Sequence, residues 1–332
     1  MIAVDANGAD RGVAAVVEGA RRAGAGVALF GPAGALGDAP GEIVDAPVAI
    51  AGDEEPARAV RAKPESSIVQ AARAVGDGSA EALVSAGATG AALAASLFHV
   101  RRLRGVARPA IAALLPVPGR PTLLLDAGAN VEVRAEHLVQ FALMGAAFMR
   151  AVHGVECPRV GLLSVGEEET KGTPDVVEAH ARLAALPPAE GHEFAGNVEG
   201  HELPAGAVDV VVTDGFTGNV ALKVMEGTAK TVGGAVRTAI RSSPVAAFGG
   251  LLARGRLGAL RRELDPNAIG GAVLLGLRRP VVIAHGGSSA DGVANAIRLA
   301  RRAVDERMVE RTADALASAD ALRSEAGASV ES

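Results

Sequence analysis

Five short stretches of this sequence combine glycine with small polar residues, and each directly follows an apolar run. They are SAGATG at 85–90, DAGAN at 126–130, VGEEETKG at 165–172, DGFTGN at 214–219 and HGGSS at 285–289. Glycine allows positive φ angles and close backbone approach, so successive N–H groups can converge on an oxyanion. A helix that begins there adds its positive dipole end. We therefore expect anion-binding groups at Ser85, Gly87, Thr89, Gly90, Asn130, Gly215, Thr217, Gly218, Asn219 and Ser288.

The same stretches also fit a purely structural interpretation. Glycine and Asx residues make tight strand-to-helix connections and helix caps, and one glycine-rich turn is a weak signal. Five such turns at the ends of strands favour a shared crevice, because loops at one rim of a parallel sheet lie together. The sequence contains no Walker phosphate loop, and no G-x-G-x-x-G follows the first apolar run, which counts against a nucleotide site.

Few charged residues accompany these stretches, and they are the candidates for chemistry. Lys171 and Lys223 are two of only four lysines, and His285 ends an apolar run. Each has a structural alternative: Lys171 could pair with a glutamate at 167–169, Lys223 could face water, and His285 could be a hydrogen-bonded core residue. The acidic candidates are Asp5, Asp126, Glu167 and Asp214, and the aspartates could equally cap helices. No G-x-S-x-G or cysteine nucleophile motif occurs, and we expect no metal ion.

The elements that position these residues alternate between strands and helices. Apolar runs bounded by glycine occur at 26–31, 81–87, 122–128, 159–166, 208–215 and 280–287, and helical patterns occur at 66–76, 135–153 and 291–316. Such alternation predicts an α/β protein with a parallel or mixed sheet covered by helices on both faces. We expect one large unit over 1–320, in one or two lobes around a cleft, and a flexible tail over 321–332.

The composition excludes several classes of function. At 332 residues, with 49% apolar and 21% charged residues, the chain has the profile of a folded soluble protein. A net charge of −5, only seven phenylalanines and no Trp or Tyr argue against nucleic-acid binding. The single cysteine, Cys157, cannot form an internal disulfide and suits a reducing cytoplasm. We expect neither a signal peptide nor a membrane-spanning helix.

The segment 244–264 differs from the rest because an apolar stripe lies beside several arginines. Its candidate contact residues are Phe248, Leu251, Leu252, Leu257 and Leu260. This pattern suits an anionic membrane surface or an acidic partner protein. Packing against a sister subunit is the alternative, and four glycines weaken the segment as an isolated helix.

Nine motifs between Ile2 and about Met308, taken in order, resemble the bacterial phosphate acyltransferase (PlsX) family of phospholipid synthesis. They include VDANGAD, SAGATGA, PRVGLLSVGEEETKG, VVTDGFTGNVALK and AHGGSS. The sequence departs from the usual family pattern at Asn7, Ala9, Thr173 and Ile283. The resemblance implies a Rossmann-like fold similar to the isocitrate and isopropylmalate dehydrogenases and the phosphotransacetylases. It also implies a homodimer with its site in an interdomain cleft.

The resemblance further implies transfer of an acyl group from acyl carrier protein (ACP) to inorganic phosphate, which gives acyl phosphate. No cofactor is implied, because phosphate itself is the nucleophile. The 85–90 and 214–219 loops would bind phosphate. Lys171 would neutralise phosphate or oxyanion charge, His285 or Lys223 would aid the leaving group, and Asp214 would orient its loop.

The partners implied by the resemblance are charged surfaces. Because ACP is acidic, its docking face should be basic, and we expect it at Arg101, Arg102, Arg104 and Arg108. Peripheral attachment to the inner face of the membrane is implied, through 244–264, with a glycerol-3-phosphate acyltransferase downstream. Three rivals stay open: a phosphotransacetylase acting on acyl-CoA, a dehydrogenase of the same fold, and a non-enzymatic ACP- or lipid-binding scaffold.

Overall fold

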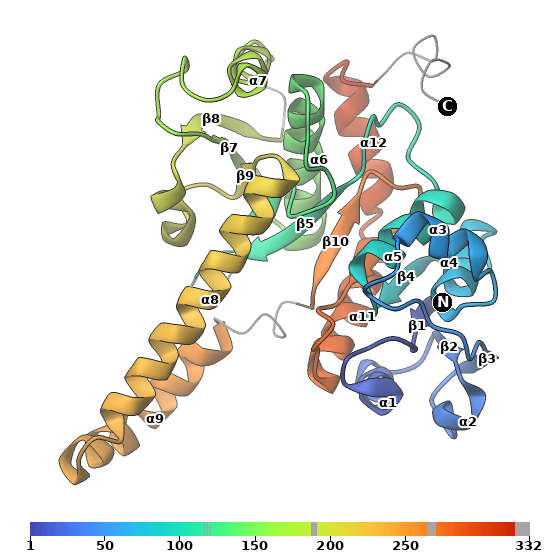
Figure 1. The fold of residues 1–332 in the computed structure, drawn as a ribbon. Coiled ribbons are helices and arrows are strands. Elements are labelled where there is room, and N and C mark those ends of the chain that lie inside the picture. Colours follow the sequence, from blue (N-terminus) through green and yellow to red (C-terminus); the bar gives the residue numbers. More distant parts are fainter. Residues whose placement is uncertain (116, 118, 120, 187–190, 264–269, 323–332) are drawn as a thin grey trace.

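The described part of the chain forms one sheet of eleven strands (Figure 1). The computed structural model describes residues 1–115, 117, 119, 121–186, 191–263 and 270–322. Across the sheet the strand order is β3-β2-β1-β4-β11-β10-β5-β6-β9-β7-β8. The strands are β1 (Ile2–Asp5), β2 (Val27–Gly31), β3 (Glu42–Asp45), β4 (Ala82–Ser85), β5 (Ala110–Leu115), β6 (Thr122–Leu125), β7 (Arg159–Leu163), β8 (Glu193–Val198), β9 (Val210–Val212), β10 (Ala272–Leu275) and β11 (Val281–Ile283).

The sheet consists of two parallel sets that run in opposite directions. The first set is β3, β2, β1, β4 and β11, and the second is β6, β9, β7 and β8. Between the sets, β10 is antiparallel to both β11 and β5, and β5 is antiparallel to β6. The expected α/β fold with a parallel or mixed sheet is therefore confirmed, and the sheet is mixed.

This reversal corrects the expectation that all five glycine-containing stretches share one rim. The loops 85–90 and 285–289 follow strands of the first set, whereas 126–130, 165–172 and 214–219 follow strands of the second set. Because the two sets of strands point in opposite directions, the two groups of loops lie at opposite ends of the strands. The expectation was wrong because a buried apolar run has the same composition in either strand direction.

Helices cover both faces of the sheet, and β1 shows how its residues divide between them. Ile2 and Val4 join a core with α1, α6, α7, α11 and α12, whereas Ala3 joins a core with α3, α4, α5 and η1. The helices of the body are α1 (Gly12–Ala23), α2 (Ala33–Leu36), α3 (Pro56–Ala62), α4 (Ser67–Gly76), α5 (Thr89–Ala95), the π-helix η1 (Ser96–Val100), α6 (Ala135–His153), α7 (Pro174–Ala184), the 3-10 helix η2 (Gly200–Ala205), α11 (Ala290–Asp305) and α12 (Met308–Ser318).

Three helices predicted from the sequence have instructive boundaries. Those at 66–76 and 135–153 are confirmed, and α6 ends at Gly154 in the left-handed conformation that favours glycine. The long helix predicted at 291–316 is instead two helices. They are separated at Arg307, which has a φ of 53°. Ala321 and Leu322 pack against the core, and residues 323–332 of the expected tail lie outside the described residues.

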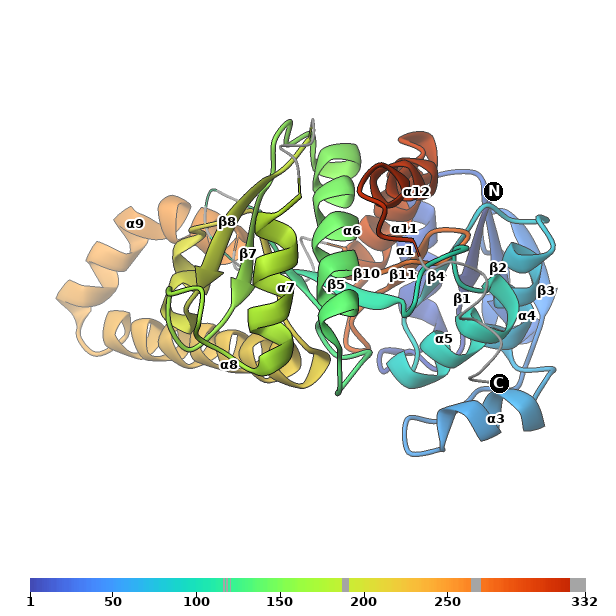
Figure 2. The same ribbon diagram turned by 90° about the horizontal axis from the view of Figure 1, so that it is seen from above.

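Two long helices form a hairpin that projects from the body in both views (Figures 1 and 2). They are α8 (Gly215–Ile240) and α9 (Pro244–Glu263). Only the start of α8 packs against the sheet, through side chains such as Leu222. Phe248, Leu251, Leu252 and Leu260 of α9 are exposed. No helix in the part of the chain that the structure describes is long and apolar enough to cross a membrane.

Candidate functional site

A buried carboxylate at the end of β1 organises the first group of loops. Asp5 is only 2% exposed, and it accepts hydrogen bonds from the Ser67 hydroxyl at 2.6 Å and the Ser85 hydroxyl at 2.7 Å. Burial raises the pKa of the Asp5 carboxyl from 3.8 to about 6, against the lowering effect of these hydrogen bonds. The Ser85 oxygen in turn accepts the Gly87 N–H at 3.1 Å. Asp5 therefore positions the 85–90 loop through buried hydrogen bonds and does not face a ligand directly.

The helix that follows this loop begins without a cap. α5 starts at Thr89 after Ala88, which offers no side-chain acceptor to the first turn. The first N–H groups of a helix lack intrahelical partners, so an uncapped start leaves donors for another acceptor. Gly90 is needed because a side-chain carbon there would come within 2.7 Å of Pro56. Thr89 itself is exposed at this start.

His285 lies beside the 85–90 loop because β11 pairs with β4. Ile283 is opposite Ser85, and the next residue, Ala284, donates its N–H to the Ser85 carbonyl at 2.8 Å. His285 is exposed, so it is not the core histidine of the alternative interpretation. Its Nδ1 accepts the Gly287 N–H at 3.2 Å. In the neutral ring the proton is therefore on Nε2.

In the second group, Asp126 is an internal anchor. Its carboxylate accepts N–H groups from Ile111, Gly128 and Ala129 at 3.0 Å each, and from Asn130 at 2.7 Å. The Asn130 amide also donates to it, at 2.8 Å. Burial raises the pKa of Asp126, with these hydrogen bonds acting in the opposite direction. The carboxylate is fully buried, so it stabilises the 126–130 loop and its contact with β5.

The 214–219 segment, which the sequence suggested as a loop, is the N-cap and first turn of α8, and it interlocks with this anchored loop. The Gly215 N–H donates to the Asn130 carbonyl at 2.6 Å, and the Asp214 carboxylate accepts the Thr217 N–H at 2.8 Å. A side-chain carbon at Gly218 would collide with the Asp126 carbonyl oxygen. Glycines here permit close packing of two loops, and the start of α8 is already capped by a carboxylate. Phe216, the one large side chain of this segment, is 61% exposed.

The two candidate lysines also belong to the second half of the sheet. Lys171 lies in an exposed loop whose backbone is held by Ser164, because the Ser164 hydroxyl donates to the Lys171 carbonyl at 2.9 Å. Within the described residues its ammonium makes no ion pair with Glu167 or its neighbours, in contrast to the structural alternative. Lys223, on the exposed side of α8, pairs with Glu226 at 2.9 Å. The structure therefore does not place His285 with Lys223 in one hydrogen-bonded group.

The remaining expected residues are Ser288 and the four arginines at 101–108. Ser288 is buried and donates its N–H to the His285 carbonyl at 2.8 Å. Arg101, Arg102, Arg104 and Arg108 are all exposed, and the Arg102 guanidinium also donates to the Ala107 carbonyl. Sequence reasoning missed Ser67, the second hydroxyl on Asp5. The only available signal was that Ser67 ends EPARAVRAKPESS at 55–67, another of the nine family-like motifs.

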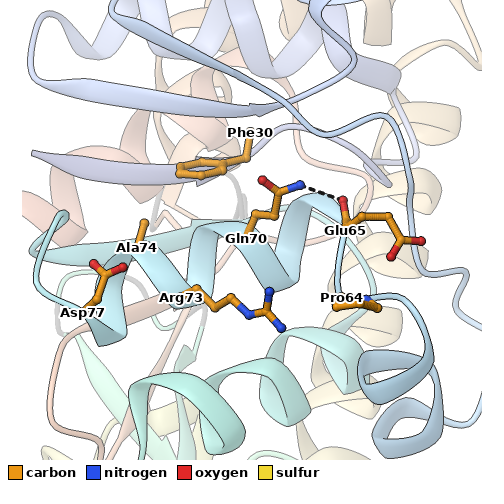
Figure 3. A pocket seen from close by; sticks show the side chains of 7 residues that line it. All are labelled: Phe30, Pro64, Glu65, Gln70, Arg73, Ala74 and Asp77. Carbon is orange, nitrogen blue, oxygen red and sulfur yellow. Dashed lines mark hydrogen bonds between the residues drawn. The ribbon is translucent and has the colours of Figure 1, made fainter.

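Neither of two surface cavities coincides with these loops. One, of about 460 Å³, lies beside α4 and is lined by Phe30, Gln70 and Asp77 among others, and Gln70 donates to the Glu65 carbonyl there at 2.9 Å (Figure 3). The other, of about 740 Å³, lies at the far end of α4 and η1. No group of three metal-ligating side chains occurs among the described residues.

Solved structures of similar fold include phosphotransacetylases. The chain superposes on the phosphotransacetylase from Streptococcus pyogenes with a TM-score of 0.59 and 18% identity, over 92% of this chain and 94% of that one. The EutD phosphotransacetylase from Staphylococcus aureus gives 0.56 and 18%, over 91% and 94%. At such low identity these structures show the shared fold alone.

Sequence relatives are much closer. Residues 1–311 match the family described as "Fatty acid synthesis protein". The chain is 43% identical to the phosphate acyltransferase of Anaeromyxobacter sp. (strain Fw109-5), over 97% of this chain and 92% of the relative. It is 44% identical to that of Elusimicrobium minutum, over 80% and 76%. The chain therefore belongs to the fatty acid synthesis protein family, the family of the phosphate acyltransferases.

Proposed function

We propose that this protein transfers the acyl group of acyl-ACP to inorganic phosphate and so supplies acyl phosphate for phospholipid synthesis. Family membership supports acyl transfer to phosphate. The observation that carries the assignment to a particular site is the combination of an uncapped helix start at Thr89 with an exposed His285 just after β11, the strand that pairs with β4. N–H donors and a histidine are the groups that an anionic nucleophile and a thiolate leaving group require.

The reaction balances without a protein nucleophile. An oxygen of hydrogen phosphate attacks the thioester carbonyl carbon, the C–S bond breaks, and the phosphate proton ends on the thiol sulfur. N–H groups at the start of α5 and the Thr89 hydroxyl hold phosphate or the tetrahedral oxyanion, and one such donor contributes about 3 kcal/mol. His285, protonated on Nε2 when neutral, donates to the sulfur and regains a proton from phosphate. Asp5 and Ser85 act as positioning residues for the loop.

The second half of the sheet supplies the remaining proposed contacts. Lys171, exposed and without an ion-pair partner among the described residues, stays our proposed cation for phosphate charge, and the loop that carries it lies at the strand ends opposite to those of Thr89 and His285. Thr217 and Asn219 are the proposed phosphate contacts of this same second group. Lys223 has a weaker claim to a catalytic role, because Glu226 already compensates its charge at 2.9 Å.

The proposed partners follow from exposed surfaces. ACP binds the basic region that begins at Arg101. The apolar side chains exposed on α9, with Leu257 partly covered, hold the protein on the inner face of the cytoplasmic membrane. There the protein is a homodimer that releases acyl phosphate to a glycerol-3-phosphate acyltransferase.

Release of free ACP thiol from acyl-ACP, measured with and without phosphate, tests this proposal. Thiol release that depends on phosphate is expected, and replacing His285 by alanine should lower kcat about a hundredfold. His201→Ala, which removes an exposed histidine of η2, is the matched control. Higher kcat/KM with acyl-CoA than with acyl-ACP would favour the phosphotransacetylase alternative. Binding of ACP without thiol release would favour the scaffold.

Lys171→Ala provides a separate test of the second group. A cation that neutralises phosphate should matter most when phosphate is scarce, so the apparent KM for phosphate should rise several-fold. Unchanged turnover at low phosphate would remove Lys171 from the site and leave the reaction assignment intact.

A further inference from the structure

Four arginines from three separate segments line the cavity of about 740 Å³ at the far end of α4 and η1. They are Arg73, Arg101, Arg278 and Arg279. The two acidic residues of the lining, Asp77 and Glu310, leave it with an excess of two positive charges. The whole chain carries a net charge of −5. This basic cavity is therefore a local exception on an acidic protein.

Backbone contacts hold two of these arginines side by side. Arg101 has a φ of 68°, an unusual value for a residue with a side chain, and its carbonyl accepts the Arg278 N–H at 3.0 Å. The Arg278 Nε donates to the Arg102 carbonyl at 3.1 Å. These contacts fix the loop after η1 against the loop between β10 and β11, so the positive charges are gathered by the fold.

Protein carboxylates compensate little of this charge. Among the described residues, Arg73, Arg101 and Arg279 form no ion pair within 4 Å, and only Arg279 has a further carboxylate close enough to interact, because it helps to lower the pKa of Glu81. Figure 3 shows Arg73 projecting from α4 with no hydrogen bond to the other side chains drawn. The Asp77 carboxylate is engaged by the Ser79 N–H at 2.9 Å and the Ser79 hydroxyl at 2.6 Å. Like charges held close together repel one another, and an anionic partner removes that cost.

The cavity lies at the opposite end of the α5–η1 helix from the proposed reaction site. Val100, at the cavity wall, is eleven residue steps from Thr89 at the uncapped start of α5, which corresponds to about 16 Å at ~1.5 Å per helical residue. A small anionic substrate bound in the cavity would be too far from His285 to react. A carrier protein that docks there and extends its flexible acyl-bearing arm along this helix would reach it.

We infer that the basic cavity formed by Arg73, Arg101, Arg278 and Arg279 is the docking site for the acidic acyl carrier protein. The inference rests on the proposed function, because acyl-ACP is the donor proposed there. It also changes the surface expected from the sequence. Of the four arginines at 101–108, only Arg101 lines the cavity, and the Arg102 guanidinium is occupied by the Ala107 carbonyl. Arginines distant in sequence replace the others.

Charge reversal tests this docking site. Arg101→Glu and Arg278→Glu should each weaken binding of holo-ACP, measured directly by titration, and raise the KM for acyl-ACP on the order of tenfold. The losses should shrink as salt is added, because screening weakens the wild-type attraction. Turnover of a small acyl thioester that lacks the carrier protein should keep its wild-type kcat, which shows that the variants are folded and that the reaction site is intact.

Two matched variants make the result decisive. Arg182→Glu introduces the same charge change on α7, in the other half of the molecule, and should leave ACP affinity within twofold of wild type. Arg108→Glu tests the contiguous segment, and an effect larger than that of Arg101→Glu would overturn the cavity as the docking site. Unchanged ACP affinity in both Arg101→Glu and Arg278→Glu would overturn it as well. Failure of the proposed function itself would appear differently, as wild-type protein that releases no thiol from either donor.

Discussion

The starts of α5 and α8 have similar sequences and opposite structures. Each follows a buried strand and begins within a glycine-containing stretch, α5 at Thr89 of SAGATG and α8 at Gly215 of DGFTGN. At α8 the Asp214 carboxylate caps the Thr217 N–H, and the Asn130 carbonyl takes the Gly215 N–H. At α5 the capping position is Ala88, which has no side-chain acceptor. One helix start is closed by protein groups, and the other is open to a ligand.

The atoms closest to the glycines also differ between the two helix starts. Added side-chain carbon at Gly218 would collide with a backbone carbonyl, which cannot move aside. At Gly87 the nearest atoms would be the Asp5 carboxylate at 3.3 Å and the Ser85 hydroxyl at 3.4 Å, both on side chains. At both starts the group that approaches a glycine is protein, so the two starts differ in the cap, which is a carboxylate at α8 and is absent at α5.

The largest expected effect on stability is at the capped start of α8. Gly218→Ala should lower the free energy of unfolding by at least about 3 kcal/mol, because the new methyl group must displace the Asp126 carbonyl or the start of α8. Denaturant unfolding followed by circular dichroism measures the change. Gly227→Ala, in the same helix with no atom within 4 Å of the added carbon, should instead stabilise by roughly 0.5–1 kcal/mol. Equal stabilities for the two variants would contradict the interlocked loops.

Substitution of Asp5, the buried carboxylate beneath the uncapped start of α5, should have a smaller effect on stability, and this effect depends on pH. Because the pKa of Asp5 in the folded protein, about 6, lies above its ordinary value of 3.8, the folded state binds the proton more tightly. Its contribution to stability is present below about pH 4 and is lost as the pH rises to about 6. Asp5→Asn has no such loss, so its stability relative to wild type should increase by roughly 2 kcal/mol across this interval.

Urea unfolding at several pH values between 4 and 6.5 checks the Asp5 prediction. Asp77→Asn is the control, because hydrogen bonds from Ser79 lower the pKa of Asp77. A lowered pKa stabilises the folded state above about pH 4, so the stability difference for this variant should change little across the interval, and in the opposite direction to that of Asp5→Asn. A constant difference for Asp5→Asn would show that Asp5 is not held in a desolvating site.

The smallest expected change in stability comes from adding a capping side chain at the uncapped start of α5. Ala88→Asp supplies α5 with the kind of cap that Asp214 gives α8, and should stabilise the protein by about 1 kcal/mol. The carboxylate would occupy the position proposed for phosphate, so the apparent KM for phosphate should rise. Ala88→Ser, a cap without charge, should stabilise with a smaller rise in KM. A KM unchanged in Ala88→Asp would move the phosphate site away from this loop.

The strands and many of the helices could be predicted because their signals are local. Apolar runs such as TLLL and VVV become β6 and β9, and the pattern at 135–153 becomes α6. The direction of each strand could not be predicted, because an apolar run does not record which neighbour it pairs with. The break at Arg307 could not be predicted either, because the apolar periodicity continues through it while the backbone turns there with a φ of 53°.

The sequence by itself determined the family, the α/β class and the small group of polar residues at strand ends, because each depends on residue types in a fixed order. Only the tertiary structure decided which of those residues face outward. Asp126 and Asp5 became internal anchors because neighbouring N–H and O–H groups surround them, whereas His285 stayed exposed beside an uncapped helix. Arg101 and Arg278, 177 positions apart by their residue numbers, became neighbours because strand pairing joined their loops. Hydrogen bonding between segments distant in sequence is the physical reason for the difference.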